Sequence, residues 1–136
     1  MSDGDAHDSY NMLGALTGNP VNQIRDHLII SSFSRQHLGL RVGDWMYIPS
    51  RGGGGWTHGQ PGDHILGSPA SIKFANQKNS DILDGSYRFN APDEQLYNLK
   101  EDLSQTTNLV EINSDKAHMM RTMLRFIRQT QHTRFE

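Results

Sequence analysis

The feature that most constrains this chain is a long interruption in its apolar pattern, from Ser50 to about Pro92. Gly, Pro, Asn, Asp and Ser punctuate this stretch, and its apolar islands, such as residues 72–74 and 82–83, are short. A segment of this length without regular structure, inside a compact domain, is usually functional or disordered. The core must therefore come from residues before and after it, and we expect a long Gly-rich loop at 50–92.

Three short segments before this loop are typical of β-strands. Residues 27–33 read HLIISSF, residues 37–42 alternate between apolar and other side chains, and residues 45–49 read WMYIP. Gly43 and Asp44 separate the last two segments, and Gly suits a tight turn because it tolerates positive φ. Strands joined this closely are typical of an antiparallel sheet.

A fourth strand and one long helix follow the loop. Residues 96–99 read LYNL, and a polar turn over residues 102–108 comes next. From Ser114 as N-cap to Gln129, apolar side chains recur at helical spacing. They are Ala117, Met120, Met123, Leu124 and Ile127. A helix of this length spans about 24 Å, which covers one face of a small sheet. The predicted fold class is α+β, a small antiparallel sheet of about four strands with the C-terminal helix packed on one face.

Composition excludes several classes of function for this chain. With a net charge of −2, the chain lacks the excess of basic residues that is typical of proteins that bind nucleic acid. The absence of cysteine rules out disulfides, thiolate metal sites and a Cys nucleophile. No run approaches the roughly 18 apolar residues of a membrane span. We therefore expect neither nucleic acid nor a membrane as a partner.

The N-terminus lacks the features of a secretory signal. Residues 1–8 are acidic and polar, whereas a signal peptide has a basic region followed by an apolar one. We expect a disordered leader there, a short helix over residues 10–16, and a natural start of the polypeptide that precedes Met1.

Three stretches of the chain occur in an order that points to one family. Residues 8–18 read DSYNMLGALTG and are followed by IRDHL at 24–28. Residues 39–48 read GLRVGDWMYI, and residues 95–109 read QLYNLKEDLSQTTNL. Together they resemble the C-terminal domain of sulfatases, the arylsulfatase-like members of the alkaline-phosphatase-like superfamily.

The departures from the family pattern fall at strand and turn positions. Met46 stands where the family usually has Lys, Leu103 where it usually has Pro, and Gln105 where Glu is common. The resemblance implies that residues 1–25 are a leader and a short helix from the end of a larger domain. It further implies that residues 26–136 form the C-terminal domain of a sulfuric ester hydrolase, whose N-terminal sulfatase domain is its main partner.

The resemblance also implies where the chemistry lies. Sulfatases use a formylglycine made from Cys or Ser in a Cys/Ser-x-Pro-x-Arg motif, and a calcium ion held by Asp and Asn side chains. This chain has no Cys, no Ser in that pattern and no acidic cluster with calcium-ligand spacing. We therefore expect no cofactor, metal or catalytic residue here, with calcium and formylglycine in the N-terminal domain. We also expect no sulfatase turnover by this chain alone.

In this family the C-terminal domain supplies one wall of the substrate pocket. Arg and His suit the anionic group of a sulfated glycan, and Trp offers a stacking face. The predicted substrate-binding residues are Arg35, His37, Arg51, Trp56, His58 and His64. Structural explanations stay open, since Arg35 and His37 can be polar turn residues and Trp56 can pack under its own loop. His58, His64 and Asp63 can also be read as a metal site, although scattered polar loop residues are more often solvated.

Two other functions stay open at this point. The chain can be a binding module that holds a sulfated glycan or another anion without turning it over. It can also be a structural domain that associates with itself, because the surface that packs on a larger domain would be exposed in isolation. Exposed apolar patches above roughly a few hundred Å² tend to find partners. We therefore expect a homodimer or a higher oligomer for the isolated chain.

Overall fold

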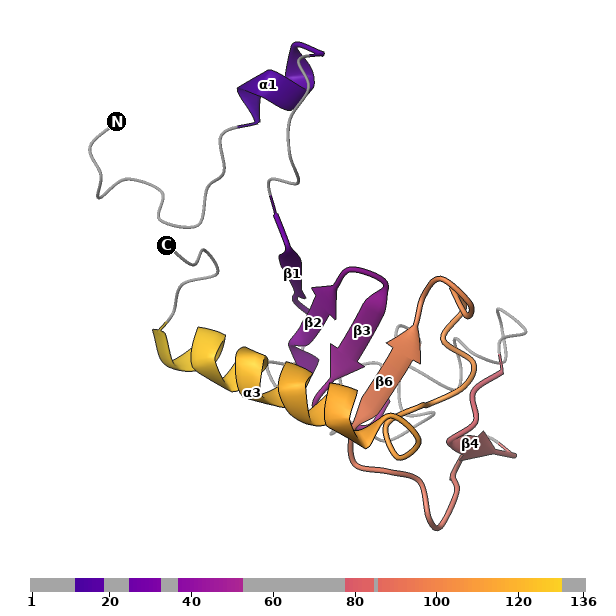
Figure 1. The fold of residues 1–136 in the computed structure, drawn as a ribbon. Helices are drawn as coiled ribbons and strands as arrows, with labels where there is room; N and C mark the ends of the chain where they lie inside the picture. Colours follow the sequence, from indigo (N-terminus) through magenta and orange to yellow (C-terminus); the bar gives the residue numbers. More distant parts are fainter. Residues whose placement is uncertain (1–11, 19–24, 33–36, 53–77, 85, 131–136) are drawn as a thin grey trace.

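The computed structural model describes residues 12–18, 25–32, 37–52, 78–84 and 86–130. The elements in chain order are α1 (Leu13–Leu16), β1 (His27–Ile30), β2 (Gly39–Val42), β3 (Trp45–Ile48), β4 (Ile82–Leu83), β5 (Ser86–Tyr87), β6 (Gln95–Asn98) and α3 (Ser114–Thr130). Four strands form an antiparallel sheet in the order β1-β2-β3-β6, and α3 lies across one face of it (Figure 1). The predicted α+β class, with about four strands and a C-terminal helix on the sheet, is confirmed.

The turn between β2 and β3 has the conformation that its sequence predicts. Val42 and Trp45 are the last paired residues, so Gly43 and Asp44 form a two-residue turn in which Gly43 has a φ of 57°. The carbonyl of Asp44 also accepts a hydrogen bond of 2.7 Å from the amide of Leu99, just beyond β6. One turn therefore closes the hairpin and fixes the end of the strand that pairs with it.

The core lies between the sheet and α3. Its buried members are Leu40, Tyr47, Leu96, Val110, Ala117, Met120, Leu124 and Ile127. All four buried apolar residues of the helix belong to the stripe predicted from periodicity, and Met123 packs at the edge of the same cluster. Trp45 is half-buried against this cluster, and the ammonium of Lys116 lies 5.7 Å from the centre of its ring. The helix and the sheet thus bury the residues that the pattern selects.

The second face of the sheet is buried at β3 and β6, whereas Leu28 of β1 and Arg41 of β2 are exposed on it. Alternation along β3 predicts that one pair of side chains faces the core and the other faces out or toward a neighbouring domain, and Met46 of the second pair is only 6% exposed. Its thioether end lies over Gly39 on β2, where a β-carbon would collide with it. Gln95 and Tyr97 of β6 are also buried. Met46 is therefore buried on the face opposite the helix, because missing side-chain volume at Gly39 leaves room for it.

Some boundaries differ from expectation. The first strand ends at Ile30. Of the helix predicted over residues 10–16, the described part is α1, which buries none of its residues. The predicted loop at 50–92 contains the two-stranded hairpin of β4 and β5. The amide of Ala117 bonds to the carbonyl of Asn113, which puts Asn113 rather than Ser114 in the N-cap position of α3.

Candidate functional site

The long loop leaves the sheet through a short segment whose backbone is held by side chains. Gln95 donates from Nε2 to the carbonyl of Ser50 at 2.5 Å and to that of Gly52 at 2.9 Å. His37 places Nε2 2.5 Å from the carbonyl of Arg51. Each of the three successive carbonyls from Ser50 to Gly52 therefore has a side-chain partner. We call residues 50–52 the loop start.

Arg51 fixes the loop start to the segment that precedes β6. Its Nε lies 3.1 Å from the carbonyl of Pro92 and 3.0 Å from a carboxylate oxygen of Asp93, and its Nη2 donates to the carbonyl of Ala91. The guanidinium also lies over the ring of Tyr87, 5.7 Å from the ring centre. Burial raises the pKa of Tyr87 to about 12, and Arg51 opposes this shift. The phenol is therefore neutral at physiological pH and acts as a packing face for the cation.

The loop returns over residues 78–81, which we call the loop end, and it returns to the same strand. Asn79 donates from Nδ2 to the hydroxyl of Tyr97 and to the carbonyl of Gln105, both at 2.9 Å. The hydroxyl of Tyr97 donates in turn to Oε1 of Gln95 at 2.7 Å. Burial raises the pKa of Tyr97, so this phenol keeps its proton. The loop start and the loop end thus meet on β6.

Asn108 connects the loop end to β6 and to the segment between β6 and α3. Its Oδ1 accepts from the amides of Leu96 at 3.0 Å and Val110 at 3.1 Å. Its Nδ2 donates to a carboxylate oxygen of the buried Asp81 at 2.7 Å and to the carbonyl of Glu94 at 2.9 Å. One side chain therefore satisfies partners in several segments.

Asp102 shapes the turn just before Asn108. Its carboxylate accepts from the amides of Thr106 at 2.7 Å and Thr107 at 2.8 Å. Although burial acts in the opposite direction, these hydrogen bonds lower the pKa of Asp102. The carboxylate of Asp102 therefore holds the polar turn that was predicted over residues 102–108.

A second polar cluster ties α3 to the sheet. Arg121 donates from Nε to both carboxylate oxygens of Glu94, at 2.8 and 3.0 Å, and from Nη2 to one of them. These hydrogen bonds lower the pKa of Glu94 and raise that of Arg121. The buried hydroxyl of Tyr47 lies beside this pair, and burial raises its pKa to about 12. The cluster stabilises the contact between helix and sheet.

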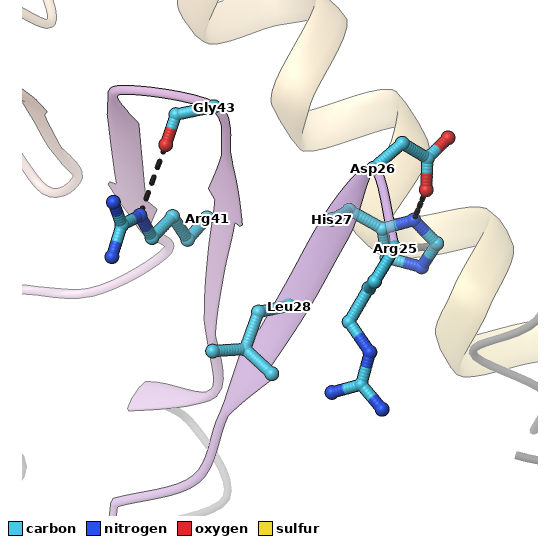
Figure 2. Close-up of a pocket in the computed structure, with 6 residues that line it drawn as sticks. All are labelled: Arg25, Asp26, His27, Leu28, Arg41 and Gly43. Atoms are coloured by element: carbon cyan, nitrogen blue, oxygen red, sulfur yellow. Dashed lines mark hydrogen bonds and ion pairs between the residues drawn. The ribbon is translucent and has the colours of Figure 1, made fainter. Parts of the chain in front are cut away.

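A separate open pocket lies at the β1–β2 side of the sheet (Figure 2). It has a volume of about 280 Å³. Its lining residues are Arg25, Asp26, His27, Leu28, Arg41 and Gly43. Asp26 accepts from Nδ1 of His27 at 2.5 Å, and Nε of Arg41 donates to the carbonyl of Gly43 at 2.9 Å. The pocket shares no residue with the predicted substrate wall.

Two of the six predicted substrate-binding residues fall in the described part of the chain. His37 is 4% exposed, and both His37 and Arg51 hold the backbone around the loop start. This geometry gives them a structural role, and substrate binding by them stays a prediction. The other four lie outside the described residues: Arg35, Trp56, His58 and His64.

We call the loop start, the loop end and the side chains that hold them the loop base. Several of its residues were not singled out by the sequence analysis. Gln95, Tyr97 and Asn79 look like ordinary strand and loop residues, and most of their side-chain partners come from distant segments. The available signal was the QLYN segment itself, which places two polar side chains at strand positions that turn out to be buried.

Within the described ranges, no three His, Cys, Asp or Glu side chains are grouped so that they could hold a metal ion. No helix in that part of the chain has the length and apolar character to cross a membrane. Comparison with known proteins identifies no family. No protein-family model matches the chain, and no curated protein sequence matches it.

Proposed function

We propose that this chain is the C-terminal domain of a sulfatase-like sulfuric ester hydrolase. In this proposal it supplies one wall of the substrate pocket and is inactive alone. The observation that carries the proposal is the pairing of β3 with β6. These strands belong to two of the stretches that resemble the family, residues 39–48 and 95–109, and the intervening chain separates them widely in sequence. The resemblance therefore lies in residues that build one sheet, as expected for a shared fold.

The loop base supports a role in presenting a substrate wall. Gln95, His37 and Arg51 hold the loop start, and Asn79 holds the loop end on the same strand. Predicted binding residues carried by the loop would therefore act from a fixed base. In the proposal, the nucleophile and the calcium ion belong to the larger domain, and this domain adds contacts to the organic part of the sulfate ester.

Steady-state kinetics of the polypeptide encoded by the whole reading frame test this role. We expect Arg51→Lys to raise KM for 4-nitrophenyl sulfate several-fold with little change in kcat, because Lys cannot make the forked contacts of Arg. Arg41→Lys is the matched control, since Arg41 is exposed and makes one hydrogen bond to a nearby carbonyl. Equal KM values for the two variants, with folding intact by circular dichroism, would refute a wall role for this region.

The alternative of a non-catalytic binder has its own test. Titration of the chain with N-acetylglucosamine 6-sulfate, against N-acetylglucosamine as control, measures binding of the sulfate group. A binding module predicts millimolar or tighter affinity for the sulfated sugar that weakens in Arg51→Ala and Trp56→Ala. Undetectable binding would end this alternative.

The alternative of self-association is favoured by exposed apolar side chains. Leu13 and Leu16 of α1 are 64% and 81% exposed, and Leu28 and Ile30 of the edge strand β1 are about 40% exposed. Edge strands without charged side chains pair readily with other chains. Light scattering at high protein concentration tests this alternative, and a monomer would contradict it.

A further inference from the structure

We infer that Gln95 and Tyr97 are positioning residues that couple the two ends of the long loop, so that loosening one end loosens the other. The coupling itself is a property of the described residues and does not depend on the proposed function. Its consequence for ligand affinity rests on the alternative function proposed above, in which the chain itself binds a sulfated sugar. The segments concerned are the loop start at residues 50–52 and the loop end at residues 78–81.

The coupling runs through one continuous chain of hydrogen bonds. The carbonyls of Ser50 and Gly52 accept from Nε2 of Gln95, whose Oε1 accepts from the hydroxyl of Tyr97 at 2.7 Å. The same hydroxyl accepts from Nδ2 of Asn79 at 2.9 Å. The phenol therefore stands between the loop start and the loop end and contacts the side chains that hold both.

In this hydrogen-bond network, every polar hydrogen of the two amide side chains, those of Gln95 and Asn79, has a partner. The two hydrogens on Nε2 of Gln95 serve two loop-start carbonyls. Those of Asn79 serve Tyr97 and the carbonyl of Gln105, while its Oδ1 accepts from the amide of Asp81 at 2.9 Å. A flip of either amide would place its oxygen against backbone carbonyls that now accept its hydrogen bonds, so each amide has one favourable orientation. A saturated network of this kind fixes one arrangement, because each member orients the next.

Burial of Tyr97 and Gln95 strengthens the coupling, because water has little access to the hydrogen bond between them. Tyr97 is 1% exposed and Gln95 is 6% exposed. Removing the hydroxyl of Tyr97 leaves Oε1 of Gln95 and one hydrogen of Asn79 facing a ring edge. Buried polar groups without partners destabilise the arrangement that contains them. The local equilibrium then shifts toward open states of both loop ends.

Native-state amide exchange of the chain tests the coupling. Gln95→Leu removes the contacts to the loop start, and among the described residues the side chain of Gln95 is linked to that of Asn79 through Tyr97. We expect exchange at Ser80 and Asp81 in the loop end to become roughly 5-fold faster, the change expected on losing one ordinary hydrogen bond. Tyr97→Phe should have the same effect.

Tyr47→Phe is the matched control. It removes a hydroxyl from an equally buried tyrosine of the same sheet, one that lies beside Glu94 and Arg121 instead. After correction for global stability, it should leave exchange at the loop end unchanged. Wild-type exchange at Asp81 in both Gln95→Leu and Tyr97→Phe, or equal acceleration in Tyr47→Phe, would overturn the coupling.

Affinity for N-acetylglucosamine 6-sulfate separates the coupling from the binding alternative. If the wild-type chain binds this sugar, the positioning role predicts at least a 3-fold weaker affinity in Tyr97→Phe than in Tyr47→Phe. Equal affinities would overturn that role. If the wild-type chain does not bind it, the ligand consequence is refuted, while the exchange data still decide whether the loop ends are coupled.

Discussion

Replacing Asn108 by Ala removes a junction on which several segments depend. The side chain makes four hydrogen bonds of 2.7 to 3.1 Å, two as acceptor and two as donor. Each such bond contributes about 0.5–1.5 kcal/mol net. Their sum is about 2–6 kcal/mol, and the partial exposure of Asn108 lets water replace some of them. We therefore expect a loss of about 3 kcal/mol in the free energy of unfolding.

Urea unfolding followed by circular dichroism measures this loss, and for a domain of this size it corresponds to a melting temperature lower by about 10 °C. Asn98→Ala is the matched control. The side chain of Asn98 accepts one hydrogen bond, of 3.2 Å, from the amide of Lys100. We expect it to cost about 0.5 kcal/mol. If the two variants lose equal stability, Asn108 is not the junction that its contacts indicate.

Three further predictions concern the core, a turn and an ion pair. Met120→Ala should cost about 2–5 kcal/mol in chemical denaturation because Met120 is fully buried, whereas Met119→Ala, at a 46% exposed position, should cost less than about 0.5. Gly43→Ala should cost about 1 kcal/mol because φ is 57° there, and Gly43→Asn should cost less; equal costs would contradict the turn argument. The hydrogen bond from Arg121 lowers the pKa of Glu94, so the stability that this carboxylate contributes is full above its ordinary value of 4.5. That contribution is lost as the pH falls through the lowered value, and the stability difference between wild type and Glu94→Gln should shrink below pH 4.5 in acid titrations.

The parts of the fold that depend on local spacing could be predicted from the sequence. The stripe from Ala117 to Ile127 has helical period, and α3 buries it against the sheet. Gly43 marks the turn between β2 and β3 because few other residues adopt its φ. In each case, the physical cause acts within a few residues of the pattern.

The loop base could not be predicted in the same way. The partners of Gln95 are the carbonyls of Ser50 and Gly52, and no sequence pattern links an amide side chain to backbone groups so far along the chain. The burial of Met46 likewise depends on Gly39, which becomes its neighbour only when β2 and β3 pair. His37 and Arg51 were predicted for their chemistry, but the contact between them depends on the path of the chain.

The central claim, that this chain is the C-terminal domain of a sulfatase-like hydrolase, is tested most directly by sequencing the genomic DNA immediately upstream of the Met1 codon. The claim predicts an open frame that continues upstream and encodes a Cys/Ser-x-Pro-x-Arg motif. Mass spectrometry of the corresponding peptide should then detect formylglycine. A stop codon and a ribosome-binding signal directly upstream of Met1 would contradict the claim.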